Sequence, residues 1–178
     1  MFILIRKCIP KSLKKIIRST YHNKLEIHLE KIKFFNCELK NSKIYIDKII
    51  NKNGLEVGGP SFFFRNFIKI YKNIKSLDSL NFASKTIWNK NKGHILIGKE
   101  IICCSTDMSI IPNESYDFIL SSHQLEHVAN PIKALLEFKR ILKKSGTLIL
   151  VIPNSKYNFD HKRNKTTIKH LIDDYNSN

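Results

Sequence analysis

The sequence predicts an α/β protein built on a doubly wound parallel sheet. Short apolar runs at residues 55–57, 116–120 and 147–152 have the length and composition of buried strands. A helical pattern after residue 130 separates the last two runs, and a strand–helix–strand unit places its strands parallel through a right-handed crossover. The first run ends in two adjacent glycines, which is typical of a strand that opens a ligand-binding turn.

Five strands are expected in this sheet, and they begin near Leu55, Ile74, Glu100, Tyr116 and Thr147. We predict that they are parallel, in the spatial order 3-2-1-4-5. The helix before the fifth strand begins at the Asn130 cap and at Pro131, and Gly146 ends it. Its predicted buried face consists of Ile132, Leu135, Leu136, Phe138 and Leu142. Residues 62–71 form a helix or a loop, and residues 44–50 form a strand or a helix.

The chain divides into a basic N-terminal extension at residues 1–50, helical or mixed, and an α/β domain at residues 51–178. Residues 12–18 have the pattern of a short basic amphipathic helix. Such a helix docks on the domain or makes weak contact with a membrane surface through residues 11–20. Residues 25–29 alternate like a strand, and the extension carries no chemical motif.

Charge and cysteine content limit the possible functions. The formal net charge of +16 invites a nucleic-acid interpretation. Nearly all of this charge is lysine, whose ammonium cannot form the bidentate hydrogen bonds to phosphates and bases that the arginine guanidinium forms. Nucleic acid is therefore not an expected partner. The four cysteines form no C-x-x-C pair, and neither a secretory signal nor an apolar stretch of membrane-spanning length is apparent. We therefore expect a cytoplasmic protein.

A glycine turn and a downstream acid form the first candidate site. Gly58 and Gly59 follow the apolar strand directly, and glycine lets backbone N–H groups approach a ligand closely. Asp78 lies 20 residues beyond Gly58, where nucleotide-binding α/β units place an acid that binds ribose hydroxyls. We expect Asp78 at the end of a second strand over residues 74–77. An ordinary tight turn is the alternative interpretation of the two glycines.

From residue 55 to residue 175 the order of motifs resembles class I S-adenosylmethionine-dependent methyltransferases, closest to the small-molecule type 11 group. The resemblance is carried by Leu55-Glu56-Val57-Gly58-Gly59, Asp78, Asp107-Met108, residues 116–123, Leu125-Glu126-His127 and the helix and strand between Pro131 and Pro153. Residues 159–163, 166–167 and 170–175 look like a narrower subgroup that we associate with bacterial surface-polysaccharide clusters. The resemblance implies a Rossmann-like sheet, S-adenosyl-L-methionine as cofactor, and methyl transfer to a small-molecule or glycan acceptor.

The resemblance implies roles for residues of the first two strands. Gly58 and Gly59 make room for the methionine and ribose moieties of the cofactor. Glu56 lies under the turn, near the amino end of the cofactor. Asp78 accepts hydrogen bonds from the two ribose hydroxyls, a task suited to a carboxylate with two oxygens.

Further roles are implied for residues at the other strand ends. Asp107 accepts a hydrogen bond from the adenine amino group, and the backbone N–H of Met108 faces the adenine ring. Ser122 and His123 border the transferred methyl group at the tip of the fourth strand. His123 is the first candidate for the general base, and His161, which lies past the fifth strand, is the second.

Two departures from the family pattern leave alternative functions open. The third glycine of the family turn is replaced around Pro60 and Ser61. The family sheet has seven strands, the last two an antiparallel pair, whereas this chain is expected to stop after five. A catalytically inactive, truncated methyltransferase-like binding module is therefore one alternative, and a basic RNA-binding methyltransferase is another.

Residues 123–127 also spell H-x-x-E-H, the zinc motif of inverted zincins. That motif needs a helix that places both histidines on one face, and Asn130 and Pro131 leave room for barely one helical turn. We therefore expect no metal site here and assign His127 to a loop or helix end. Asp117 is expected to anchor the start of the fourth strand.

Overall fold

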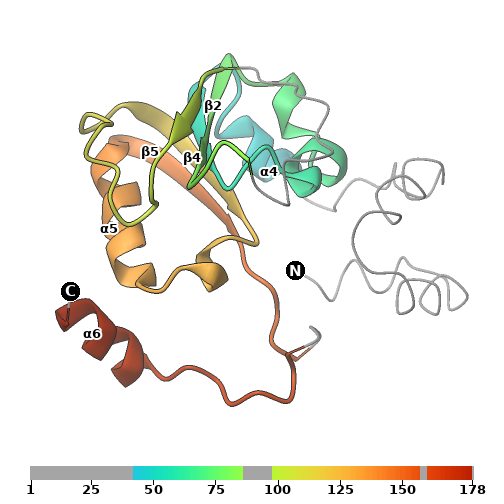
Figure 1. Cartoon of the computed structure of the whole chain (residues 1–178). Helices are drawn as coiled ribbons and strands as arrows, with labels where there is room; N and C mark the ends of the chain where they lie inside the picture. The colour runs from blue at the N-terminus through green and yellow to red at the C-terminus, as the bar shows by residue number, and fades with distance from the viewer. Residues whose placement is uncertain (1–41, 86–97, 157–159, 178) are drawn as a thin grey trace, which may run out of the picture.

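The computed structural model describes residues 42–85, 98–156 and 160–177 of the chain, shown in colour in Figure 1. In this part of the chain the sheet has five strands in the order β3-β2-β1-β4-β5, and every neighbouring pair is parallel. The strands are β1 (Asn53–Val57), β2 (Ser76–Asn81), β3 (Glu100–Ile102), β4 (Tyr116–Ser122) and β5 (Leu142–Val151). The predicted fold class and strand order are confirmed. The order reverses between β1 and β4, so the switch point lies at their carboxyl ends.

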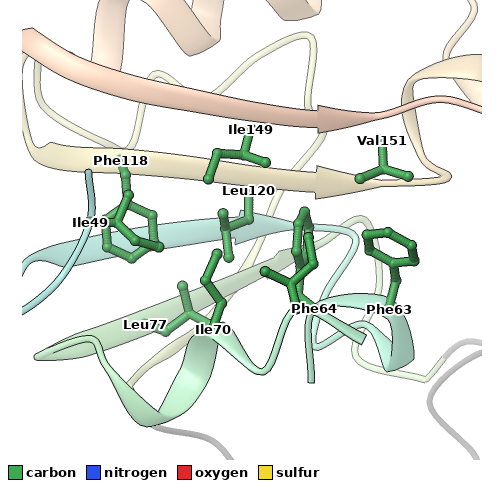
Figure 2. Packing of buried hydrophobic residues seen from close by; sticks show 10 residues of the cluster. Ile49, Phe63, Phe64, Ile70, Leu77, Phe118, Leu120, Ile149 and Val151 are labelled. Atoms are coloured by element: carbon green, nitrogen blue, oxygen red, sulfur yellow. The ribbon is translucent and has the colours of Figure 1, made fainter. Parts of the chain in front are cut away.

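One face of the sheet is covered by short helices from the first part of the domain. These are α4 (Ser42–Asp47), the π-helical turn η2 (Phe63–Phe67) and the 3-10 helix η3 (Ile70–Lys72). Figure 2 shows the aromatic rings of Phe63 and Phe64 packed beneath the strands, toward Leu120 and Val151. Ile49, which the sequence analysis placed in the N-terminal extension, is fully buried in the same cluster. The folded unit therefore includes residues that precede position 51.

Helix α5 (Pro131–Ile141) covers the opposite face. Its cap is as predicted: the Asn130 side chain accepts a hydrogen bond from the backbone N–H of Lys133 at 3.0 Å. The buried residues of α5 are Ala134, Phe138 and Ile141. The predicted buried face is correct for Phe138 but wrong for Leu135 and Leu136, which are 39% and 45% exposed. These three buried residues are spaced i, i+4 and i+7 and therefore share the face of the helix that packs on the sheet, whereas the two leucines lie outside that face.

The end of α5 also differs from the prediction. Leu142 is already extended and pairs with Tyr116, so Gly146 lies within β5 and does not end the helix. Lys143 donates to Asp117 Oδ1 at 2.8 Å, and the backbone N–H of Asn53 donates to Asp117 Oδ2 at 3.0 Å. The carboxylate thus ties β1, β4 and β5 together, which confirms the anchoring role predicted for Asp117.

The chain leaves the sheet after β5 and returns as α6 (Ile168–Asn176) beside α5 (Figure 1). The Asn130 side chain donates to the backbone oxygen of Asp174 at 3.1 Å and fastens the two helices. The H-x-x-E-H sequence lies on the short 3-10 helix η4 (Leu125–His127), and the described residues contain no cluster of metal-binding side chains. No helix in the described ranges is long and apolar enough to cross a membrane. The segments predicted at residues 11–20 and 25–29 lie outside those ranges.

Candidate functional site

A glycine turn begins where β1 ends. The Gly58 N–H donates to the backbone oxygen of Leu80 at 2.8 Å, which continues the pairing with β2 by one residue. Gly58 has a φ of +77°, and a β-carbon there would lie 2.9 Å from Cγ of Gln124. Both the backbone conformation and the close approach therefore require glycine at this position. The turn passes directly against the loop that follows β4.

Glu56 lies beneath this turn and is fully buried. Its Oε1 accepts a hydrogen bond from the Ser61 N–H at 2.9 Å, and its Oε2 accepts one from the Tyr71 hydroxyl. A β-carbon on Gly59 would lie 2.4 Å from Cδ of Glu56. The carboxylate therefore supports the turn from below, and the second glycine allows the turn to pack on it.

Asn81 is the residue that ends β2 beside the turn, and the sequence analysis missed it. It is 7% exposed, and its Nδ2 donates to the backbone oxygen of Gly59 at 3.0 Å. Its own backbone oxygen accepts from the Cys103 N–H at 3.0 Å, so it also joins β3. The pairing of β2 with β1 runs from Ser76 to Leu80 and so places Asn81 at the end of the strand. The apolar run at residues 74–77, from which the strand was predicted, does not contain this information.

The prediction that Asp78 ends β2 is wrong, because the strand continues for three residues to Asn81. The Asp78 carboxylate accepts hydrogen bonds from the Lys99 N–H at 2.8 Å and from the Tyr116 hydroxyl at 2.7 Å. Lys99 immediately precedes β3 and Tyr116 is the first residue of β4. The carboxylate is thus engaged on the amino side of the sheet, away from the glycine turn.

Ser122 and His123 lie at the carboxyl end of β4. The His123 N–H donates to the backbone oxygen of Val151 at 2.9 Å, and His123 adopts a left-handed φ of 53°. Ser122 Oγ lies 2.9 Å from Nδ1 of the imidazole, and the ring centroid is 6.4 Å from that of Phe63. Partial desolvation lowers the pKa of His123 below its ordinary value, although Glu126 opposes the shift. The imidazole is therefore neutral at physiological pH and can accept a proton.

Gln124 joins the ends of β3 and β4. Its Nε2 donates to Ser105 Oγ at 3.1 Å, and its Oε1 accepts from Ser121 Oγ at 3.4 Å. Because its Cγ also packs against Gly58, this side chain brings the loop after β3 to the glycine turn. Nothing in the local sequence pattern indicated this bridge.

The loop after β3 contains Asp107 and Met108. Asp107 is exposed, and hydrogen bonding by the Ser109 side chain and by the Ser109 N–H, which donates to Oδ1 at 3.2 Å, lowers the pKa of its carboxyl. Met108 is fully buried, and its N–H donates to Glu137 Oε2 at 2.7 Å. Helix α5 thus engages this N–H through Glu137, and its predicted place facing an adenine ring stays a prediction. Asp107 itself remains available at the surface.

His161 lies in a turn of the exposed segment between β5 and α6. The ion pair between Arg163 and Asp160, at 3.4 Å, organises this turn. Figure 1 shows the segment running away from the sheet before α6 returns to α5. The structure therefore brings the glycine turn, Asn81 and the Ser122–His123 pair to one edge, and the role of His161 stays a prediction.

Comparisons with known proteins agree with this architecture. A family profile described as a methyltransferase domain matches residues 55–150, which is more than half of the chain. A search of curated proteins finds no match. A SAM-dependent methyltransferase from Thermotoga maritima, described as a possible histamine N-methyltransferase, is 19% identical with a TM-score of 0.50. That match covers 86% of this chain and 77% of the other. At this identity it supports the fold alone.

Two further solved structures show weaker likeness. The YcgJ protein from Bacillus subtilis is 15% identical, with a TM-score of 0.48 and coverage of 61% of this chain and 48% of that one. A SAM-dependent methyltransferase from Methanosarcina mazei is 17% identical, with a TM-score of 0.44 and coverage of 64% and 57%. The chain spans about half the length of the first solved structures that it matches. On the strength of the profile match, this chain belongs to the methyltransferase domain family.

Proposed function

We propose that this protein binds S-adenosyl-L-methionine at the carboxyl edge of its sheet and transfers the methyl group to a hydroxyl of a small molecule or glycan. The observation that carries the proposal is the convergence of three strand ends at the switch point. The glycine turn after β1, Asn81 at the end of β2 and the Ser122–His123 pair after β4 meet there. Open parallel sheets bind their ligands at such edges.

The described residues fit this cofactor. Gly58 and Gly59 add no side chain of their own to the turn, and Gln124 and Glu56 pack closely against them. Asn81 donates its Nδ2 to Gly59, and no described residue donates to its Oδ1, so this oxygen can accept from a ribose hydroxyl. The exposed carboxylate of Asp107 suits an adenine amino group. In this assignment Asn81 takes the position that the sequence analysis gave to Asp78.

His123 has the role of general base. When bound, the cofactor supplies an electrophilic methyl group on a sulfonium. His123 takes up the proton that the acceptor hydroxyl loses as its oxygen bonds to that carbon, while the carbon–sulfur bond breaks and its electron pair stays on sulfur, which leaves as the neutral thioether of S-adenosylhomocysteine. The contact between Ser122 Oγ and Nδ1 orients the ring, and the lowered pKa keeps the imidazole neutral. The ring of Phe63 lies on one side of His123, whose side chain is exposed to an incoming acceptor.

Two measurements on the 178-residue chain test the proposal. Isothermal titration calorimetry with S-adenosylmethionine and with S-adenosylhomocysteine should show one saturable site, and a chain that binds neither would contradict the proposal. Transfer of a radiolabelled methyl group is then assayed on a panel of nucleotide sugars and glycans. Cofactor binding without transfer would favour the inactive binding module. Strongly salt-dependent binding of RNA would favour the RNA methyltransferase.

A further inference from the structure

A half-buried tyrosine, Tyr71, closes a hydrogen-bonded ring beneath the glycine turn. The Tyr71 hydroxyl donates to Glu56 Oε2 and accepts from the Ser61 N–H at 3.0 Å. The same N–H donates to Glu56 Oε1 at 2.9 Å. Three groups from β1, from the end of the turn and from η3 are thus joined in one cluster. Neither the sequence analysis nor the proposed cofactor contacts assign a role to Tyr71.

The burial of Glu56 makes the hydrogen bonds to its carboxylate costly to lose. Glu56 is fully buried, and a carboxylate in such a place is stable only when donors surround it. Burial and the neighbouring Glu56 carboxylate raise the pKa of Tyr71, so its hydroxyl stays protonated and serves as a donor. Removal of the hydroxyl takes one donor from Glu56 and one acceptor from the Ser61 N–H.

The position of the Glu56 carboxylate in turn fixes the backbone of the turn. Gly59 packs so closely on Glu56 that a β-carbon would lie 2.4 Å from Cδ. Asn81 holds the Gly59 carbonyl at 3.0 Å from the β2 side. A carboxylate that moved would therefore move the turn on which the cofactor rests.

We infer that Tyr71 is a positioning residue for cofactor binding, which acts through Glu56 on the turn from Gly58 to Ser61. The inference rests on the proposed function. It assigns Tyr71 no contact with the cofactor: the hydroxyl is engaged by Glu56 and Ser61 on the underside of the turn. Its effect on affinity comes from pre-organisation of the turn.

The test compares Tyr71→Phe with Tyr116→Phe, a matched control that removes another tyrosine hydroxyl bonded to a carboxylate, that of Asp78. The ligand is S-adenosylhomocysteine, measured by calorimetry. We expect Tyr71→Phe to raise the Kd about tenfold. The substitution removes a hydrogen bond to the charged Glu56 carboxylate, and part of the lost free energy appears as weaker ordering of the turn that binds the cofactor. Tyr116→Phe should leave the Kd within about twofold, although we expect thermal unfolding to show that both variants are less stable than wild type. Equal Kd values for Tyr71→Phe and wild type, or equal losses in the two variants, would overturn the inference.

A double-mutant cycle identifies the route through Glu56. If Tyr71 acts through Glu56, Tyr71→Phe adds less than about twofold to the Kd of Glu56→Gln, and independent effects would multiply instead. NMR hydrogen exchange of the Ser61 amide gives a readout that needs no ligand. It should accelerate in Tyr71→Phe and not in Tyr116→Phe. If wild type binds no S-adenosylhomocysteine, the proposed function fails, and an unchanged Ser61 exchange rate separately contradicts the positioning role.

Discussion

The Asp78 carboxylate accepts a hydrogen bond from the Tyr116 hydroxyl at 2.7 Å, across a sheet in which β1 separates their strands. Together with the bond from the Lys99 N–H, it connects β2 to the start of β4 and to the residue before β3. Burial and this bond raise the pKa of Tyr116, so the phenol remains a donor. Asp78 has the distance from the glycine turn that the family gives to its ribose-binding acid, but here its carboxylate connects strands on the amino side of the sheet.

Asn81 and Asp78 can be distinguished by substitution. Asn81→Ala removes the Oδ1 acceptor and the support of Gly59, and we expect about tenfold or greater loss of S-adenosylhomocysteine affinity. Asp78→Asn should lower the free energy of unfolding by about 1–2 kcal/mol and leave the Kd nearly unchanged. Calorimetry and urea denaturation measure the two quantities. The reverse pattern would assign the ribose to Asp78.

The second prediction concerns His123. His123→Ala should lower the methyl-transfer rate by about 10²–10⁴ and leave cofactor affinity unchanged, because the lost group is a proton acceptor. His127→Ala, an exposed neighbour on η4, is the control and should retain the rate. The unprotonated imidazole is the active form and its pKa is lowered. The wild-type rate should therefore fall only as pH drops below about 6.5. An acid limb above that pH would contradict the role.

Arg140 is predicted to be a major stabilising residue. Its guanidinium donates to the backbone oxygens of Met108 and Ile111 at 2.8 and 2.9 Å, to Asn113 Oδ1 at 2.8 Å, and to Glu137. Arg140→Ala should lower the free energy of unfolding by about 2–3 kcal/mol, because several partners lose a charged donor at once.

Urea denaturation gives this value, and Lys139→Ala on the exposed side of the same helix is the matched control. That control should change stability by less than about 0.5 kcal/mol. Equal effects of the two substitutions would show that the loop before β4 does not depend on the guanidinium.

Gly54 is predicted to be intolerant of a side chain because of Phe118. A β-carbon at Gly54 would lie 2.1 Å from the ring of Phe118, which is fully buried. Gly54→Ala should destabilise the fold by about 1–3 kcal/mol through overpacking. Phe118→Leu in the same chain makes room, so the double variant should be more stable than the two separate losses predict. Strict additivity in chemical denaturation would rule out this contact as the cause.

Asp117 should give stability a specific dependence on pH. The Lys143 ammonium and the Asn53 N–H lower the pKa of its carboxyl in the folded state. Its contribution is therefore complete above the unfolded pKa of about 3.9 and is lost as pH falls through the folded value. Because the pair is partly exposed, Asp117→Asn should cost about 1 kcal/mol at pH 7. Urea titrations should show this difference shrinking below about pH 3.9, and a constant difference would contradict the linkage.

The sequence by itself determined the architecture. The apolar runs, the glycines after the first run and the Asn130–Pro131 helix start were sufficient for a parallel sheet in the order 3-2-1-4-5, which the structure confirms. They suffice because hydrophobic periodicity, helix caps and the handedness of crossovers are local or topological rules. They also located the glycine turn and the end of β4 correctly.

Only the tertiary structure decided which side chains meet. The end of β2 depends on its register against β1, which moves the strand end from Asp78 to Asn81. The exposure of Leu135 depends on how α5 is rotated on the sheet, and the use of the Met108 N–H depends on Glu137, 29 residues away. The Tyr71–Glu56 pair joins residues 15 positions apart that share no local pattern. Long-range packing selects such contacts, and neither spacing nor propensity in one sequence records them.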